Sequence, residues 1–470
     1  MDRRNLIKAL GGTTAAAATG GLFAVQDAEA ALGRVQTASQ PSDLKITDMR
    51  VVRMGPQSRR YVIRLDTNQG LYGYGEVRDG ASATYALMLK SRILGMNPCN
   101  VDKIFRKLKQ FGFHARQAGG VVAVEEACWD LAGRAWGVPC WQMLGGKFRD
   151  SIRVYSDTPA ERDPVAMGNK LKARMERGFT FLKMDVSINQ LRDVEGGLTW
   201  PKGGGVDPFN QYGNDEFAQL EHPFTGIRVT DKGLEVLQEY VATIRDIVGW
   251  EVPIATDHYG HFGIEDGIKL AQALDPFNLA WLEDMVPWFY TDQYVRLKNA
   301  CTTPILTGED IYLKEGFIDL FEKKAISICH PDIATSGGLL ETKKIGDLAM
   351  EHGISMALHM AGSPVTLMAS VHCAAATENF LVMEHHNVDN EWYDRLVTTP
   401  AGPLVGADGF VPVPDTPGLG VELNEDEVRS HLRDGEGYFD PTPEWDDERS
   451  WDRLWSLNGP TVAPPTRRRT

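Results

Sequence analysis

Three carboxylates recur in this sequence at a fixed interval. Asp257, Glu283 and Glu309 are each 26 residues from the next, and each ends a short apolar run. That interval fits one strand, one helix and two short loops, so the acids occupy the same place in three successive βα units. In a parallel barrel this place is the carboxyl end of adjacent strands, where active sites form. Three oxygen donors that converge there suit a hard divalent cation, and we predict Mg²⁺.

The elements that would position these acids are visible on either side of them. From about residue 151 the chain alternates β-rich runs with helical runs, a pattern typical of parallel α/β proteins. Runs that end at Asp332, His359 and Glu384 continue the rhythm beyond the third acid. We therefore predict an α/β fold, a TIM-type (β/α) barrel, over residues 151–400.

The chain before and after this region has other patterns. Residues 44–77 carry three β-type runs, and residues 80–137 then become helical, which predicts a compact α+β capping domain over residues 41–150. Residues 401–440 are rich in Pro and Gly and would return to pack on that domain. Residues 441–470 would form a C-terminal tail.

One interval breaks the βα rhythm. Asp185 and Asp257 should be one unit apart, yet 72 residues separate them. Residues 187–229 hold several Gly and Pro residues and little periodicity, so we interpret them as an insertion at the active-site end of the second strand. The aromatic residues of this insertion favour a lid or a subunit contact over disorder.

The first 30 residues form a segment of another kind. Arg3-Arg4 precede a run of small and apolar residues, and Ala28-Glu29-Ala30 is a small-x-small site. This pattern resembles a twin-arginine signal peptide, so we predict cleavage after Ala30 and a periplasmic or secreted mature protein. The run is too short and too rich in Gly and Thr for a membrane anchor.

The composition narrows the class of partner. The chain has 470 residues, a net charge of −15, and 43% hydrophobic and 24% charged residues, as expected for a globular protein of two or three domains. The acidic balance argues against nucleic acid as a partner, because phosphate binding needs a basic face. We expect no membrane contact of the mature form. The six scattered cysteines form no CxxC motif, which argues against a thiolate metal site.

Four motifs resemble those of one family: Trp281-Leu-Glu283-Asp284 (WxEE), Thr307-Gly308-Glu309 (GE), Pro331-Asp332 with Gly337-Gly338 (PDxxxxGG), and Leu358-His359 with Gly362-Ser-Pro364 (a catalytic histidine strand). From about residue 44 to 435 the sequence resembles the enolase superfamily, in its mandelate racemase/muconate lactonizing branch, nearest to acid-sugar (galactonate-type) dehydratases. The resemblance implies metal-assisted abstraction of the proton α to a carboxylate, through an enediolate intermediate.

The resemblance also implies roles for the residues at the strand ends. Asp257, Glu283 and Glu309 would be metal ligands. His359 would be the general acid/base, and Asp332 its partner, because an adjacent carboxylate orients an imidazole and raises its pKa.

The second and eighth strands carry further candidates. Lys183 resembles the first lysine of a Lys-x-Lys motif, which contacts the substrate carboxylate. Asp185 replaces the second lysine and becomes a candidate substrate contact, so a two-base racemase is disfavoured. Glu384 stands where the family places an acid that donates to the substrate, a role for a buried carboxyl kept protonated.

The third strand differs from the galactonate-type pattern, which has a catalytic histidine two residues after the aspartate. Tyr259 occupies that position here and points inward by strand alternation. His261 is an alternative that reaches in from the loop. The proton donor to the leaving hydroxyl is therefore open between His359, Tyr259 and His261. From the capping domain, Arg53 is a candidate substrate contact.

These observations predict an exported Mg²⁺-dependent dehydratase of a sugar acid, an aldonate or aldarate. His359 would take the α-proton, the 3-hydroxyl would leave as water, and a 2-keto-3-deoxy acid would result. One alternative is an epimerase, racemase or cycloisomerase of a small carboxylate substrate, which loses no water. An alternative of another class is a non-catalytic, metal-dependent sugar-acid-binding protein. By analogy with the family, we expect a homo-oligomer.

Overall fold

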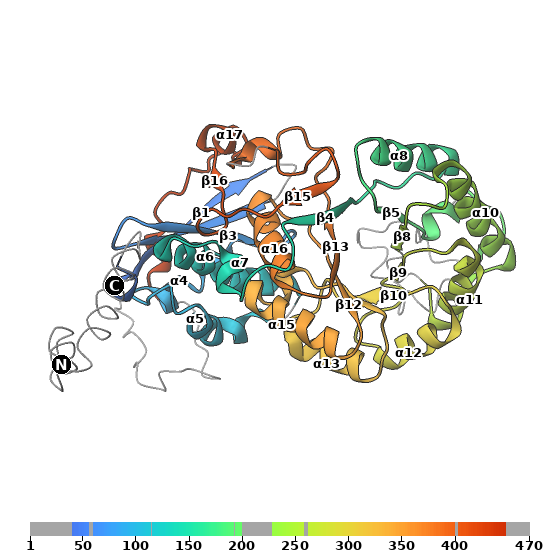
Figure 1. The fold of residues 1–470 in the computed structure, drawn as a ribbon, viewed down its shortest axis with the longest axis horizontal. Coiled ribbons are helices and arrows are strands. Elements are labelled where there is room, and N and C mark those ends of the chain that lie inside the picture. Colours follow the sequence, from blue (N-terminus) through green and yellow to red (C-terminus); the bar gives the residue numbers. More distant parts are fainter. Residues whose placement is uncertain are drawn as a thin grey trace, which may run out of the picture.

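The computed structural model describes residues 40–55, 60–113, 115–191, 193–199, 228–257, 262–399 and 403–447. The segment 1–30, Tyr259, His261 and most of the insertion lie outside the described residues, as does the tail beyond 447. The chain forms an N-terminal α+β domain and a parallel barrel, which lie side by side in Figure 1.

The N-terminal domain is built on an antiparallel meander. Its strands are β1 (Ile46–Met54), β2 (Arg60–Thr67) and β3 (Tyr72–Val77), in the order β1-β2-β3. Its helices are α3 (Thr84–Leu87), α4 (Lys90–Ile93), α5 (Val101–Leu108), α6 (Ala118–Trp136) and α7 (Cys140–Met143). α6 is buried on almost every side, because it lies between this sheet and the helices of the barrel. The predicted α+β domain is confirmed.

Close contact between β3 and α6 depends on glycine. A Cβ atom at Gly75 would lie 1.9 Å from the carbonyl oxygen of Ala123. Gly75 lies within β3 and Ala123 within α6, so neither backbone can move away easily. We expect Gly75→Ala to lower the free energy of unfolding by about 3 kcal/mol, measured by urea denaturation. The matched control is Gly267→Ala in α11 (Ile264–Leu274), where the nearest atom is 4.0 Å away. That change should stabilise by about 0.5–1 kcal/mol, and equal effects of the two variants would contradict this packing.

The barrel closes eight parallel strands on themselves. In the order of pairing they are β4 (Ser151–Ser156), β5 (Leu182–Asp185), β8 (Ile254–Asp257), β9 (Leu282–Glu283), β10 (Ile305–Thr307), β11 (Ile328–Cys329), β12 (Ser355–Leu358) and β13 (Phe380–His385). β13 pairs with β4 and completes the ring. The predicted TIM-type barrel is thus confirmed.

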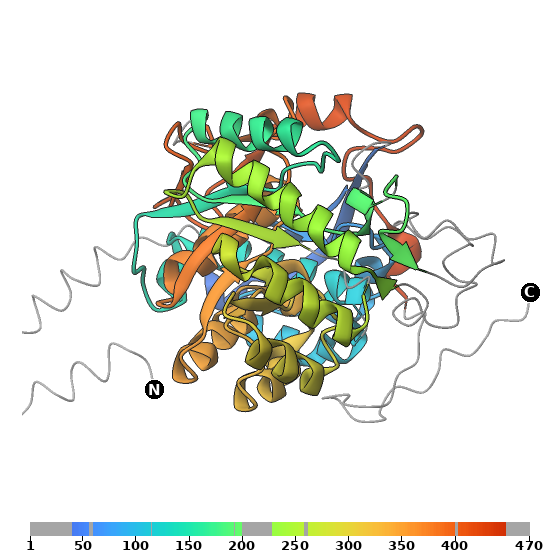
Figure 2. The same ribbon diagram turned by 90° about the vertical axis from the view of Figure 1, so that its right-hand side faces the viewer.

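Helices cover the outside of the barrel. They are α8 (Pro164–Glu176), α10 (Asp231–Val248), α11, α12 (Thr291–Ala300), α13 (Leu313–Glu322), α15 (Gly338–Glu351) and α16 (Pro364–Ala376). Figure 2 views the molecule from the barrel side, with the green and yellow helices in front. Thr230 caps α10, because its hydroxyl oxygen accepts a hydrogen bond from the Gly233 amide. Among the described helices, none is long and apolar enough to cross a bilayer.

An apolar floor fills the barrel interior. Each strand or its approach supplies one buried residue: Tyr155, Phe181, Ala255, Trp281, Leu306, Ile328, Ala357 and Val382. Side chains along a strand alternate between inside and outside, so the residue two positions after each of these also points inward. The floor therefore supports a second layer of side chains at the carboxyl ends of the strands.

The segment after the barrel returns to the N-terminal domain. β15 (Phe410–Pro412) pairs antiparallel with β4, and the chain then passes through α17 (Glu425–Ser430). Beyond α17, the Arg433 amide donates to the Arg53 carbonyl at 2.9 Å. Near the end of the described residues, the Asp446 carboxylate lies 2.6 Å from the buried Lys90 ammonium. These contacts join the two ends of the described chain.

Candidate active site

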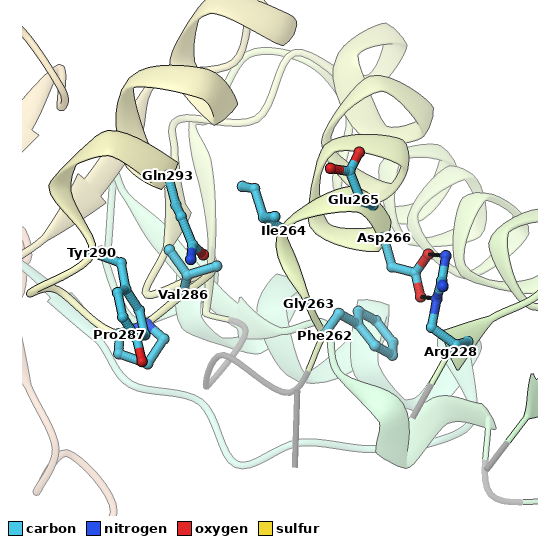
Figure 3. A pocket seen from close by; sticks show the side chains of 10 residues that line it. All are labelled: Arg228, Phe262, Gly263, Ile264, Glu265, Asp266, Val286, Pro287, Tyr290 and Gln293. Carbon is cyan, nitrogen blue, oxygen red and sulfur yellow. Dashed lines mark hydrogen bonds and ion pairs between the residues drawn. The ribbon is translucent and has the colours of Figure 1, made fainter. Parts of the chain in front are cut away.

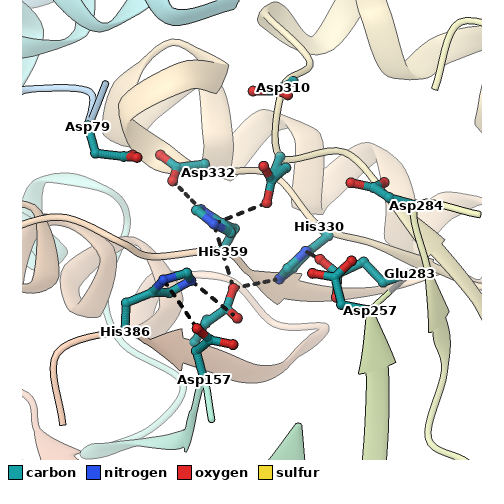
Figure 4. Close-up of polar contacts among 12 residues, drawn as sticks. Asp79, Asp157, Asp257, Glu283, Asp284, Asp310, His330, Asp332, His359 and His386 are labelled. Atoms are coloured by element: carbon teal, nitrogen blue, oxygen red, sulfur yellow. Dashed lines mark hydrogen bonds and ion pairs between the residues drawn. The ribbon is translucent and has the colours of Figure 1, made fainter. Parts of the chain in front are cut away.

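The layer above the barrel floor is almost entirely ionisable. Two positions beyond the floor residues of six strands lie Asp157, Lys183, Asp257, Glu283, His330 and Glu384, and His359 follows the same rule on β12. Glu309 lies one residue further along because Gly308 occupies the inward position after β10. The structure therefore brings together the predicted residues of strands that are far apart in the sequence (Figure 4).

Lys183 is the cation at the centre of this layer. Its Nζ atom lies 2.7 Å from Glu384, 3.1 Å from Asp257 and 3.2 Å from Glu283, and the side chain is only 2% exposed. Burial lowers the pKa of Lys183, but the three carboxylates outweigh it and raise the pKa well above its usual value. Lys183 is therefore positively charged and balances part of the acidic cluster.

Removing this cation should destabilise the protein. We expect Lys183→Met to lower the free energy of unfolding in EDTA by about 3–5 kcal/mol, because it leaves buried carboxylates without a partner. The control is Lys323→Met, whose ion pair with Asp292 is exposed and should cost less than about 1 kcal/mol. Urea denaturation measures both, and an equal midpoint for Lys183→Met and the wild type would contradict the assignment.

His359 and Asp332 form the predicted pair. The His359 Nδ1 atom lies 2.5 Å from Asp332 Oδ2, and both side chains are buried. Burial raises the pKa of Asp332, but Arg78 and His359 outweigh it and lower the pKa below its usual value. The Nε2 atom of His359 faces the barrel mouth, 3.0 Å from a Glu309 oxygen. The geometry suits a general base whose orientation is fixed by a carboxylate.

Arg78 brings the N-terminal domain into the site. It follows β3, is buried, and its Nη1 atom lies 2.6 Å from Asp332. Its Nη2 atom lies 3.7 Å from Glu309. Arg78 could not be predicted as a site residue, because no local motif links it to a barrel strand. Its place shows that the capping domain helps to organise the charges of the barrel mouth.

Three acids form a group of oxygen donors. The ligand atoms of Glu283, Asp284 and Glu309 all lie within 4.8 Å of one another. Burial, and then the charges of Glu309 and Glu283, raise the pKa of Asp284 well above its usual value. This crowding of like charges, together with the hard oxygen donor set, fits a divalent cation.

Asp257 lies next to this group of three acids but is not one of its members. Its carboxylate lies beside Glu283 in Figure 4, and both pair with Lys183. Asp284 takes its place in the group because of a turn that the sequence did not reveal: its φ angle is 45°, and its Oδ1 atom accepts the Thr307 hydroxyl at 2.5 Å. Asp284 belongs to the motif that resembles WxEE, but the resemblance implies no role for it.

Glu384 differs from its expected state. Burial raises its pKa, but Lys183 and His386 outweigh it and hold the pKa well below the usual range. The structure therefore holds Glu384 ionised, whereas the resemblance implied a protonated donor. The physical reason is the Lys183 ammonium at 2.7 Å, which comes from β5, separated from β13 by β4 alone.

Two histidines of the layer were also missed. His330 is fully buried, with Nδ1 2.8 Å from Glu283 and Nε2 3.3 Å from the Tyr155 hydroxyl. His386 follows β13 and lies between Glu384 and Asp157. The signal that could have found them is the period of two along each strand, applied to every strand rather than to the acids alone.

The remaining candidates have mixed outcomes. Asp185 ends β5 and pairs in register with Asp257 at the barrel mouth. Arg53 on β1 pairs instead with Glu436 of the return segment, at 2.8 Å, so its role as a substrate contact stays a prediction. Tyr259 and His261 lie outside the described residues.

A separate cavity lies between the starts of α11 and α12. Its volume is about 440 Å³, and Figure 3 shows its lining, which includes Phe262, Val286 and Tyr290. Two of its charged groups, Arg228 and Asp266, form two hydrogen bonds of 2.7 and 3.0 Å with each other. The third, Glu265, pairs with Arg296. Of the predicted site residues that the structure describes, none lines it. Those residues gather at the barrel mouth instead.

Two protein-family models match this chain. The family described as enolase C-terminal domain-like matches residues 166–427, and the N-terminal domain of mandelate racemase/muconate lactonizing enzyme matches residues 34–145. The chain belongs to this branch of the enolase superfamily, and the resemblance is confirmed.

Named relatives and a solved structure agree with this. D-xylonate dehydratase of Haloferax volcanii is 31% identical over 407 residues, which cover 85% of this chain and 91% of that protein. D-galactonate dehydratase of Variovorax paradoxus is 25% identical, covering 82% and 94%. A mandelate racemase/muconate lactonizing enzyme-like protein from Rubrobacter xylanophilus has a TM-score of 0.71 at 29% identity, covering 85% of this chain and 100% of that one.

Proposed function

We propose that this protein is a Mg²⁺-dependent dehydratase of a sugar acid. The observation that carries the proposal is the His359–Asp332 pair directed at a group of carboxylates on neighbouring strand ends. Two relatives that match most of the chain are named D-xylonate dehydratase and D-galactonate dehydratase. Both names describe the loss of water from an aldonic acid.

The acids at the strand ends would bind the cation in this reaction. Glu283 and Glu309 would hold the cation together with Asp257, and Asp284 offers a further oxygen beside them. Bound there, a divalent cation supplies positive charge to the substrate carboxylate as the α-proton leaves.

The protein groups around this site would orient the substrate and move the proton. Lys183 helps to hold the pKa values of Glu384 and Glu283 below their usual range and presents a positive charge to the substrate. The Nε2 atom of His359 takes the α-proton, and Asp332 stabilises the imidazolium that forms. The 3-hydroxyl then leaves as water, and the enol product becomes a 2-keto-3-deoxy acid.

The test is a screen of aldonic and aldaric acids, including D-xylonate and D-galactonate, with Mg²⁺ present. We expect one or more acids to yield a 2-keto acid, and their α-hydrogen to exchange in D₂O when followed by NMR. Exchange without any loss of water would replace the proposal with an epimerase. Binding of an acid without exchange would replace it with a binding protein.

A further inference from the structure

A second histidine–aspartate pair lies in the barrel mouth. His386 is four positions beyond the floor residue Val382, in the same relation that Asp332 has to Ile328. Its Nδ1 atom lies 3.5 Å from Asp157 Oδ2, and its Nε2 atom lies 3.4 Å from Glu384 Oε1. The pairing of β13 with β4 sets this contact, because Ser156 is in register with His385.

The pair has direct access to the reacting centre. The His386 side chain is 33% exposed, whereas that of His359 is 5% exposed. The two imidazole rings are neighbours, with centroids 5.2 Å apart and a T-shaped arrangement (Figure 4). A substrate whose α-carbon faces His359 therefore brings its next carbon, which carries the leaving hydroxyl, towards His386.

The surrounding charges favour the protonated ring. Burial and Lys183 lower the pKa of His386, but the carboxylates of Glu384 and Asp157 outweigh them and raise it to about 9. Other ionisable groups that interact with His386 are His359, His385 and Asp79. At neutral pH the ring thus carries a proton that it can donate, as a general acid must.

We propose that His386 is the acid that protonates the departing 3-hydroxyl, with Asp157 as its positioning residue. This inference rests on the proposed dehydratase function, and it assigns the step that the sequence left open between His359, Tyr259 and His261.

The proposed loss of water conserves atoms, protons and electron pairs. His359 removes the proton from C2, and the electron pair of that bond forms the C2–C3 double bond. The C3–O bond breaks, and its electron pair stays on oxygen, which takes the proton from Nε2 of His386 and leaves as water. His386 ends neutral and His359 ends protonated. Proton exchange with solvent restores both.

The test separates loss of water from removal of the α-proton. We expect His386→Gln to reduce the formation of 2-keto acid from D-xylonate or D-galactonate by about 100-fold or more. Exchange of the α-hydrogen in D₂O should stay within about twofold of the wild type, because His359 and Asp332 are unchanged.

A second probe removes the need for the acid. In the same sugar acid with fluorine in place of the 3-hydroxyl, the leaving group is fluoride, which departs without protonation. His386→Gln should release fluoride at close to the wild-type rate. A merely structural role would slow all three readouts together.

Two further variants sharpen the result. His431→Gln is the matched control, because His431 is a partly exposed histidine of the return segment, paired with Glu427 at 3.1 Å. This variant should keep the wild-type rates of exchange, dehydration and fluoride release. Asp157→Asn removes one carboxylate beside His386. The loss of dehydration at high pH should then begin below pH 9, because the acid gives up its proton at a lower pH.

The outcomes distinguish the two proposals. If the wild type neither dehydrates nor exchanges any acid in the screen, the dehydratase function fails, and this inference fails with it. If the wild type dehydrates but His386→Gln keeps its full rate, or loses exchange and fluoride release as well, only the assignment of His386 is overturned. The same holds if Tyr259→Phe or His261→Asn is the variant that separates exchange from dehydration.

Discussion

His359→Asn is expected to lower kcat by about 10³-fold or more and to abolish exchange of the α-hydrogen. The reason is that Nε2 of His359 faces the barrel mouth while Nδ1 is held by Asp332 at 2.5 Å. An asparagine preserves a hydrogen bond to Asp332 but offers no basic nitrogen. Stopped assays for 2-keto acid and NMR in D₂O measure the two effects.

Metal binding should survive this substitution, because the carboxylate group lies on other strands. The increase in Tm caused by Mg²⁺ reports it independently of activity. His431→Asn, which removes an imidazole on the return segment, serves as the control and should keep full turnover. A fully active His359→Asn enzyme would show that the base lies elsewhere.

Removal of divalent cations is expected to abolish turnover, and added Mg²⁺ should restore it. Three carboxylates lie within 4.8 Å of one another, those of Glu283, Asp284 and Glu309. Burial raises the pKa of Asp284, and repulsion by the other two carboxylates raises it further. A bound cation relieves this repulsion. At 100 times its dissociation constant, Mg²⁺ should stabilise the fold by about 2.7 kcal/mol.

The matching variant is Glu283→Gln, which should lose both the rescue by Mg²⁺ and the increase in Tm. The control is Glu265→Gln, because Glu265 is an exposed acid paired with Arg296 at the surface. It should respond to EDTA and Mg²⁺ as the wild type does. A preparation that dehydrates a sugar acid equally well in EDTA would contradict the metal assignment.

Some parts of the site follow from the sequence around each residue, and others depend on contacts between distant segments. The equal spacing of Asp257, Glu283 and Glu309 reflects the length of a βα unit, which is set by chain geometry alone. The pairing of Asp332 with His359 is implied by the resemblance of their motifs to those of the family. The barrel could therefore be predicted from the spacing, and the histidine–aspartate pair from the motifs.

Other parts of the site depend on contacts that no local pattern encodes. Arg78 reaches Asp332 across 254 positions of sequence, from a different domain. The ionised state of Glu384 depends on Lys183, which is 201 residues away in sequence and comes from a strand that only β4 separates from β13. The same is true of the Asp157–His386 contact, which exists only because β13 closes on β4.

The sequence by itself determined which residues stand at the strand ends and which of them point inward, because both follow from the repeat length and the strand period. Only the tertiary structure decided their charge states and partners. The physical reason is that the field at each side chain is the sum over neighbours brought together by barrel closure and by the capping domain. Those neighbours are distant in sequence, so their effects on pKa cannot be read along the chain.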